Sequence, residues 1–100
     1  MRKIYPKDDR ERYLYIIQCE SFYKIGIAWN YEDRFNNLKG SNPFEIKLVG
    51  AVLLNNAAKM EEELHQLFKE KRVKCEWFKL DGEDLLKIVD YIKEHGDLVR

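Results

Sequence analysis

The sequence predicts a single α+β domain in which a small, mainly antiparallel β-sheet is flanked by three helices. Two short runs of β-branched and aromatic residues, roughly 12–18 and 22–28, lie close enough along the chain to form a hairpin. Three later stretches repeat apolar residues at helical spacing. The 100 residues match one domain, and such a chain buries about two thirds of its unfolded surface without a disulfide or a structural metal.

The hairpin follows a charged N-terminal stretch. Residues 1–11 contain Pro6 and show no periodicity, so we expect a flexible arm before the domain. A tight connection at Cys19-Glu20-Ser21 then joins the two strands. Alternate side chains of a strand face opposite sides of a sheet. One face is therefore expected to carry Tyr13, Tyr15 and Ile17, and the other Leu14 and Ile16.

The middle of the chain predicts a helix and then a strand. Asn30 is a favoured N-cap for a helix over roughly 31–39, and Gly40 is a suitable residue for its C-terminal cap. The largely apolar run over 44–54 is typical of a central strand, which is buried on both faces.

The last part of the chain predicts a helix, a strand and a helix. The second helix is expected over roughly 57–71, and an aromatic strand over 76–80. The third helix begins at Asp81 or Gly82 and ends near residue 95. The predicted order is β-β-α-β-α-β-α, in a domain over residues 12–95 with a C-terminal tail over 96–100.

Charge balance, the length of apolar runs and cysteine spacing indicate which kinds of partner and compartment to expect. Lys and Arg number 18 and Asp and Glu number 18, so the chain does not bind nucleic acid by bulk charge, although a local basic patch is compatible with this balance. No apolar run spans a bilayer and no signal peptide is recognisable, which predicts a cytoplasmic protein. Cys19 and Cys75 lack CxxC spacing, so reduced thiols are favoured over a disulfide.

A set of short motifs occurs in a fixed order along residues 12–80. It consists of Tyr13-Leu14-Tyr15, Lys24-Ile25-Gly26 preceded by Tyr23, Arg34, Glu61-x-x-Leu64-His65, and Glu76-Trp77-Phe78. Together these motifs resemble the GIY-YIG nuclease family, and more closely its phage-type branch. The chain departs from the family at two positions, because Tyr13 replaces the first-triplet glycine and Lys24 replaces the second-triplet tyrosine. The late family asparagine has no clear counterpart.

The resemblance implies a metal-dependent endonuclease that hydrolyses DNA phosphodiester bonds. It implies that Glu61 holds one Mg²⁺ or Mn²⁺ ion and that Arg34 binds the phosphate. It also implies that Tyr15 positions or deprotonates the attacking water. A phenol needs a nearby cation for that role, and Lys24 on the adjoining strand is expected to lower its pKa. His65 lies one turn after Glu61 and is an alternative base.

Each candidate residue also has a structural interpretation. Glu61 belongs to a run of three glutamates, which is typical of a solvated face, but it borders the apolar stripe of its helix. His65 is equally suited to a structural hydrogen bond. Basic residues near the end of the second helix either contact phosphates or offset the helix dipole. The candidates for nucleic-acid contact are Tyr13, Tyr23, Lys69, Lys71, Arg72 and Lys74.

Two other functions remain open at the level of sequence. The departures at Tyr13 and Lys24 and the zero net charge favour a catalytically weak or inactive nucleic-acid-binding or regulatory module of the same fold. Exposed aromatic residues would alternatively serve a protein-interaction domain. For a nuclease, DNA is the expected partner, and a homodimer or a partner protein would supply specificity.

Overall fold

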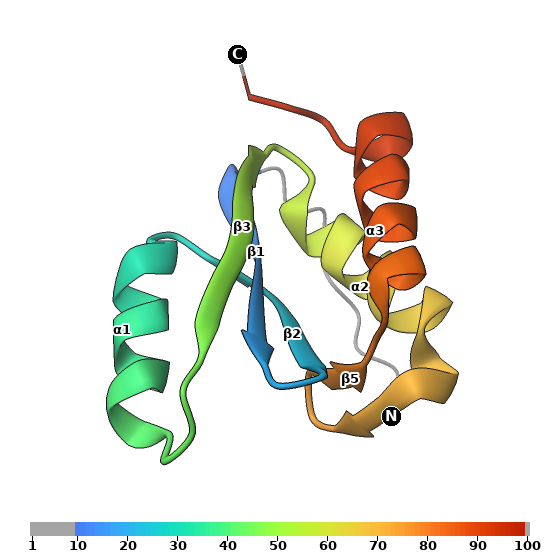
Figure 1. The fold of residues 1–100 in the computed structure, drawn as a ribbon. Helices are drawn as coiled ribbons and strands as arrows, with labels where there is room; N and C mark the ends of the chain where they lie inside the picture. Colours follow the sequence, from blue (N-terminus) through green and yellow to red (C-terminus); the bar gives the residue numbers. More distant parts are fainter. Residues whose placement is uncertain (1–9, 100) are drawn as a thin grey trace.

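The computed structural model describes residues 10–99, which form one five-stranded sheet with three α-helices (Figure 1). Neighbouring strands are antiparallel, in the order β3-β1-β2-β5-β4. The predicted α+β class is confirmed. Most of the expected N-terminal arm, residues 1–9, lies outside the described residues. The strands are β1 (Arg12–Cys19), β2 (Phe22–Ala28), β3 (Lys47–Leu54), β4 (Arg72–Lys74) and β5 (Trp77–Lys79).

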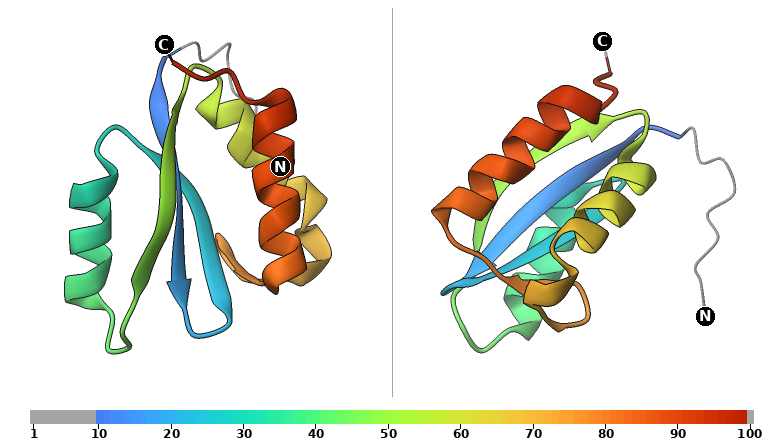
Figure 2. Two further views of the ribbon diagram at one scale, coloured as in Figure 1. Left: turned by 45° about the horizontal axis from the view of Figure 1, so that its top comes forward. Right: turned by 90° about the vertical axis from the view of Figure 1, so that its right-hand side faces the viewer.

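The helices cover both faces of the sheet. Helix α1 (Tyr31–Ser41) lies on one face, and helices α2 (Ala57–Leu67) and α3 (Gly82–His95) lie on the other (Figures 1 and 2). Side chains along β1 alternate between the two faces of the sheet, as predicted, and so contribute to two separate core clusters. Tyr15 and Ile17 pack in the cluster beneath α1, while Leu14 joins the larger cluster beneath α2 and α3.

The hairpin register brings the two candidate triplets together. Strands β1 and β2 pair from Tyr13 opposite Ala28 to Cys19 opposite Phe22. The turn between them needs a left-handed residue, and Glu20 adopts it with φ of 57°. Within this register Tyr15 lies directly opposite Gly26.

The expectation that residues 44–54 form a central strand was wrong. Strand β3 lies at the edge of the sheet, and β1 takes a central place because it pairs with both β2 and β3. Leu48 and Val49 are correspondingly exposed. An apolar run does not distinguish a central strand from an edge strand, since exposed apolar side chains are common on protein surfaces.

Two predicted helix ends were also wrong. Gly40 lies inside α1, which runs on to a C-cap at Asn42. Helix α2 ends at Leu67 rather than 71, and a 3₁₀ turn over Lys69–Lys71 leads into β4, which the sequence did not predict. Phe68 is buried and its carbonyl accepts a hydrogen bond from the Lys71 amide at 2.8 Å, which tightens the chain there.

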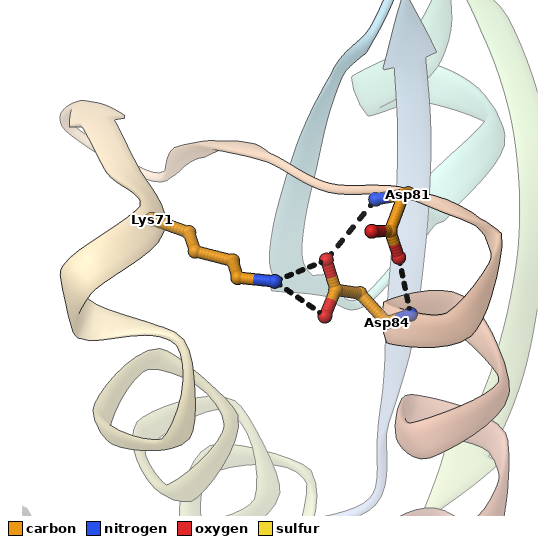
Figure 3. A network of polar contacts seen from close by, with 3 residues as sticks. All are labelled: Lys71, Asp81 and Asp84. Atoms are coloured by element: carbon orange, nitrogen blue, oxygen red, sulfur yellow. Dashed lines mark hydrogen bonds and ion pairs between the residues drawn. The ribbon is translucent and has the colours of Figure 1, made fainter.

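A polar network fixes the start of α3, at the predicted position (Figure 3). The Asp81 carboxylate accepts a bond from the Asp84 amide at 2.9 Å, and the Asp84 carboxylate accepts one from the Asp81 amide at 3.1 Å. This reciprocal pair is a capping box. Lys71 donates to both oxygens of Asp84, at 2.8 and 2.7 Å, and so ties the 3₁₀ turn that follows α2 to the start of α3.

The described part of the C-terminal tail is bonded to the end of β3. Leu98 forms a bridge with Leu54, and the Asn55 amide donates to the Asp97 carbonyl at 2.8 Å. Cys19 and Cys75 are both free thiols, as expected. Among residues 10–99, none of the helices has the length and apolar character needed to span a membrane.

Candidate functional site

The outer edge of β2 is only half covered by its neighbouring strand. Strand β5 pairs with β2 through Phe22, Tyr23 and Lys24 and then stops. Beyond that point α2 approaches the edge, where His65 Nε2 lies 2.9 Å from the carbonyl oxygen of Ile25. Within the described residues, the stretch from Gly26 to Ala28 therefore has no strand on this side.

Tyr15 reaches across β2 at this half-covered edge. A Cβ atom placed on Gly26 would lie 2.5 Å from the Tyr15 hydroxyl and 2.7 Å from Cζ. Only glycine leaves room for the ring to lie over the neighbouring strand. The side chain is buried, with 1% of its surface exposed. Gly26 therefore allows the Tyr15 ring to approach the β2 backbone closely.

Charged groups from three parts of the chain act on the Tyr15 phenol. Burial raises the pKa of Tyr15 to about 12. The Arg34 guanidinium on α1 opposes this shift, whereas the carboxylates of Glu76 and Glu61 add to it. The expected lowering of the Tyr15 pKa is therefore wrong, because desolvation outweighs the effect of Arg34.

Lys24 does not act as the expected cation beside Tyr15. Its ammonium lies 2.7 Å from the Glu76 carboxylate, in a half-buried ion pair. The same nitrogen lies 6.0 Å from the centre of the Trp77 ring. Lys24 therefore holds Glu76 in place and offsets its charge.

Glu61 differs from the two glutamates that follow it. Its side chain is buried, with 5% exposed, whereas Glu62 and Glu63 are half-buried. Glu63 accepts a hydrogen bond from the Tyr91 hydroxyl and so links α2 to α3. The solvated-face interpretation is wrong for Glu61, because this position turns toward the sheet and its charge acts on Tyr15.

His65 is fastened to the sheet as a neutral ring. A carbonyl oxygen only accepts, so Nε2 carries the proton in the bond to Ile25, and Nδ1 is the acceptor nitrogen. The ring also lies 5.1 Å from the Phe78 ring. Burial lowers the pKa of His65, and the Ile25 carbonyl works against that shift. The structural interpretation of His65 accounts for this geometry.

The predicted aromatic contacts with nucleic acid have different environments. Tyr13 faces α1 and its ring centre lies 4.8 Å from that of Tyr31, in an edge-on arrangement. Tyr23 is buried in the core beneath α2 and α3, with 8% exposed. Tyr23 is therefore a core residue, and the prediction that it contacts nucleic acid was wrong.

The predicted basic patch is smaller than the sequence indicates. The Lys71 ammonium is paired with the Asp84 carboxylate, so its charge stabilises the start of α3. The guanidinium carbon of Arg72 lies 5.2 Å from the centre of the Phe78 ring. The positive charge of Arg72 also contributes, after burial, to the lowered pKa of His65. Lys69 and Lys74 are exposed and remain candidates for phosphate contact.

Sequence reasoning missed Glu76 as a member of the site. It had been recognised only as part of an aromatic motif, yet it pairs with Lys24 and acts on both Tyr15 and His65. The available signal was the antiparallel pairing of two strands, which places Trp77 opposite Lys24 and brings the preceding glutamate near the lysine.

The carboxylates suit a cation that keeps most of its water. Within residues 10–99, no group of three or more His, Cys, Asp or Glu side chains is arranged to hold a metal. Mg²⁺ commonly binds through one or two carboxylates and several waters. A single buried carboxylate, Glu61, fits such an ion, while the site does not fit a metal that needs an all-protein cage.

The fold and the site together define a small α+β domain with a buried tyrosine at a half-covered sheet edge, on which the charges of a buried glutamate and an exposed arginine act. Residues 12–93 match the T5orf172 domain, and the chain belongs to this family. The family is a phage-associated domain in the GIY-YIG/HNH-like endonuclease group. No curated protein and no solved structure gave a significant match. Family membership indicates a nuclease-like or DNA-binding function.

Proposed function

We propose that this protein is a GIY-YIG-type endonuclease that uses a divalent metal to hydrolyse DNA phosphodiester bonds. The observation that carries the proposal is that the Tyr15 hydroxyl lies against Gly26 at the half-covered edge of β2, where the charges of Arg34 and Glu61 both act on it. Arg34, Glu61 and Tyr15 come from α1, α2 and β1, and the two helices lie on opposite faces of the sheet. Membership of the T5orf172 family supports the same conclusion.

Arg34 is suited to bind the phosphate. It is exposed on α1, so a backbone phosphate can reach it from solvent. Its planar guanidinium donates parallel hydrogen bonds to two phosphate oxygens and stays charged at any physiological pH. In this role Arg34 fixes the phosphate beside the phenol and offsets the charge that develops during hydrolysis.

Glu61 would hold the Mg²⁺ or Mn²⁺ ion. When bound, the metal would supply Lewis-acid stabilisation to the phosphate and the leaving oxygen. Neutralising the Glu61 charge would also remove one of the effects that raise the pKa of Tyr15. The low exposure of Glu61 keeps its carboxylate oriented and partly desolvated, which strengthens its attraction to a cation.

Tyr15 would orient the attacking water through its hydroxyl. With a pKa of about 12 the phenol keeps its proton at neutral pH, so Oη can donate as well as accept a hydrogen bond. Lys24 pairs with Glu76, whose charge acts on the same phenol. His65 Nδ1 is the alternative acceptor for a proton, because its other ring nitrogen is held by Ile25.

A DNA-binding module without catalysis is the second candidate. The ion pair between Lys24 and Glu76 favours it, because a lysine replaces the family tyrosine and is committed to a carboxylate. The raised pKa of Tyr15 also favours it. Such a module would retain DNA on a filter in EDTA and would show no metal-stimulated cleavage.

The test compares Glu61→Gln with Glu62→Gln on supercoiled plasmid in Mg²⁺, Mn²⁺ and EDTA. Loss of the carboxylate at residue 61 is expected to reduce nicking by about 100-fold or more, since metal binding is worth several kcal/mol at the transition state. The Glu62→Gln control keeps its activity, because that glutamate is only half-buried and does not act on Tyr15. Undiminished nicking by Glu61→Gln would remove the assignment.

We also propose that a second copy of the chain or a partner protein supplies specificity. The surface that suits such pairing is the exposed edge of β3, where Leu48 and Val49 are partly open to solvent. Sedimentation of the protein alone and with duplex DNA distinguishes a dimer from a monomer that needs a partner.

A further inference from the structure

Trp29 is an exposed aromatic residue directly after β2. Its side chain is 61% exposed, in contrast to the half-buried Trp77. It follows Gly26 by three residues, which is about 10 Å along an extended chain. Trp29 therefore lies on the continuation of the half-covered edge beside which Tyr15, Arg34 and Glu61 act. No step in the proposed hydrolysis uses it.

Two arginines lie close to the Trp29 ring. The guanidinium carbon of Arg10 is 5.4 Å from the ring centre, and that of Arg12 is 5.9 Å away. Such contacts orient an indole by attraction between a cation and the ring face. The ring keeps most of its surface open even with both arginines beside it, so it remains accessible to a further planar group.

The neighbouring residues on the hairpin are also aromatic. Tyr13 lies opposite Ala28, the residue before Trp29, and it packs edge-on against Tyr31. This pair anchors the start of α1 to β1 and so holds the short segment that carries Trp29. An exposed indole on a fixed segment loses little conformational entropy when it binds a flat partner.

We propose that Trp29, oriented by Arg12 and flanked by Arg10, forms a platform for a nucleotide next to the phosphate that is cleaved. An unpaired or splayed base stacks on the indole, and the positive charge of the exposed Arg10 attracts the adjoining phosphate. Exposed aromatic rings with arginines are the usual means by which proteins bind single strands without reading sequence. The inference rests on the proposed function, because it places this nucleotide relative to the Tyr15 site.

The experiment measures binding in EDTA, where metal-dependent cleavage does not occur. A fluorescein-labelled 12-nucleotide single strand of mixed sequence is titrated with wild-type protein, Trp29→Ala and Trp29→Phe, and its anisotropy is recorded. Removing the ring is expected to weaken binding by about 5- to 150-fold, the range for loss of one stacked base. Trp29→Phe retains a ring and is expected to recover part of the affinity.

A second measurement follows the indole itself. The chain has two tryptophans, so Trp77→Phe leaves Trp29 as the only indole. Its fluorescence is expected to be quenched as the unlabelled single strand binds. Equal affinities of wild type and Trp29→Ala would overturn the platform, as would unchanged Trp29 fluorescence at saturation. Absence of any binding by the wild-type protein would overturn it too.

Plasmid nicking separates this inference from the proposed function. If Glu61→Gln nicks as fast as wild type, the endonuclease proposal fails while the anisotropy result for Trp29 still stands. If Trp29→Ala binds as tightly as wild type and Glu61→Gln is inactive, the platform fails and the endonuclease proposal survives.

Discussion

Tyr15 and Gly26 behave as one unit at the scale of single residues. The ring occupies the space that any other residue at position 26 would need. The glycine thus decides where the phenol lies, and the phenol position decides which charges act on it. Without this contact, Gly26 could be interpreted as a position that only makes the hairpin flexible.

Gly26→Ala is expected to destabilise the protein by about 1–3 kcal/mol, the usual cost of overpacking a filled site. The added Cβ would meet the Tyr15 hydroxyl at 2.5 Å. Urea denaturation measures the free energy of unfolding. In a Tyr15→Leu background the same alanine is expected to cost less, because the ring is gone. An equal cost in both backgrounds would show that the two positions are not coupled.

The lowered pKa of His65 predicts that the free energy of unfolding falls in mild acid. Its folded-state pKa lies below the ordinary value of 6.5, so the unfolded chain takes up the proton first as the pH falls. The His65 contribution is therefore complete above about pH 6.5 and declines as the pH drops toward the folded-state pKa.

The measurement compares unfolding free energies from pH 8 to pH 5.5 for wild type, His65→Gln and His95→Gln. Glutamine can still donate to the Ile25 carbonyl but does not titrate, so His65→Gln is expected to show a shallower decline. His95 is exposed and serves as the control. Parallel curves for wild type and His65→Gln would contradict the prediction.

At the scale of elements, a capping box and an ion pair define the beginning of α3. Asp81 and Asp84 satisfy each other's amide groups, and Lys71 binds Asp84 from the 3₁₀ turn that follows α2 (Figure 3). Burial raises the pKa of Asp84, but the bonds from Lys71 and Asp81 outweigh it, so the pKa is lowered and the carboxylate stays charged. The network therefore joins the segment between α2 and β4 to the beginning of α3.

Asp81→Ala is expected to lower the free energy of unfolding by about 0.5–2 kcal/mol, the usual cost of removing an N-cap side chain. The reason is that the Asp84 amide loses its acceptor. Thermal denaturation followed by circular dichroism measures the change. Asp90→Ala, at an exposed position within the same helix, provides the control and should change stability little. Equal losses in both variants would rule out a capping effect.

At the scale of the whole molecule, the short length of β5 makes the site feasible. Helices α1 and α2 lie on opposite faces of the sheet, so their side chains are normally separated by it (Figure 2). Strand β5 covers β2 over three residues only, which leaves the rest of that edge to α2. Arg34 and Glu61 can therefore act on one phenol from the two sides. A longer β5 would separate them.

Local patterns predicted the class of fold and much of the element order. Alternation along β1 assigned Tyr15 and Leu14 to opposite faces, because the side-chain period of a strand is fixed by its backbone. The Asp81 cap was readable because its bonds are local. The margin of the α2 stripe predicted that Glu61 could turn toward the sheet.

The tertiary structure alone decided which distant groups meet. The order of the strands placed the apolar β3 at an edge and brought Lys24 next to Glu76. The packing of the helices on the sheet buried Tyr23 and paired Lys71 with Asp84 of α3. Sequence reasoning missed these outcomes because each depends on partners far away in the chain, while residue type and spacing report only on local backbone and burial. The sequence by itself determined the strands, the helices and the chemical groups. Folding decided their neighbours, and therefore their charge states and their access to a substrate.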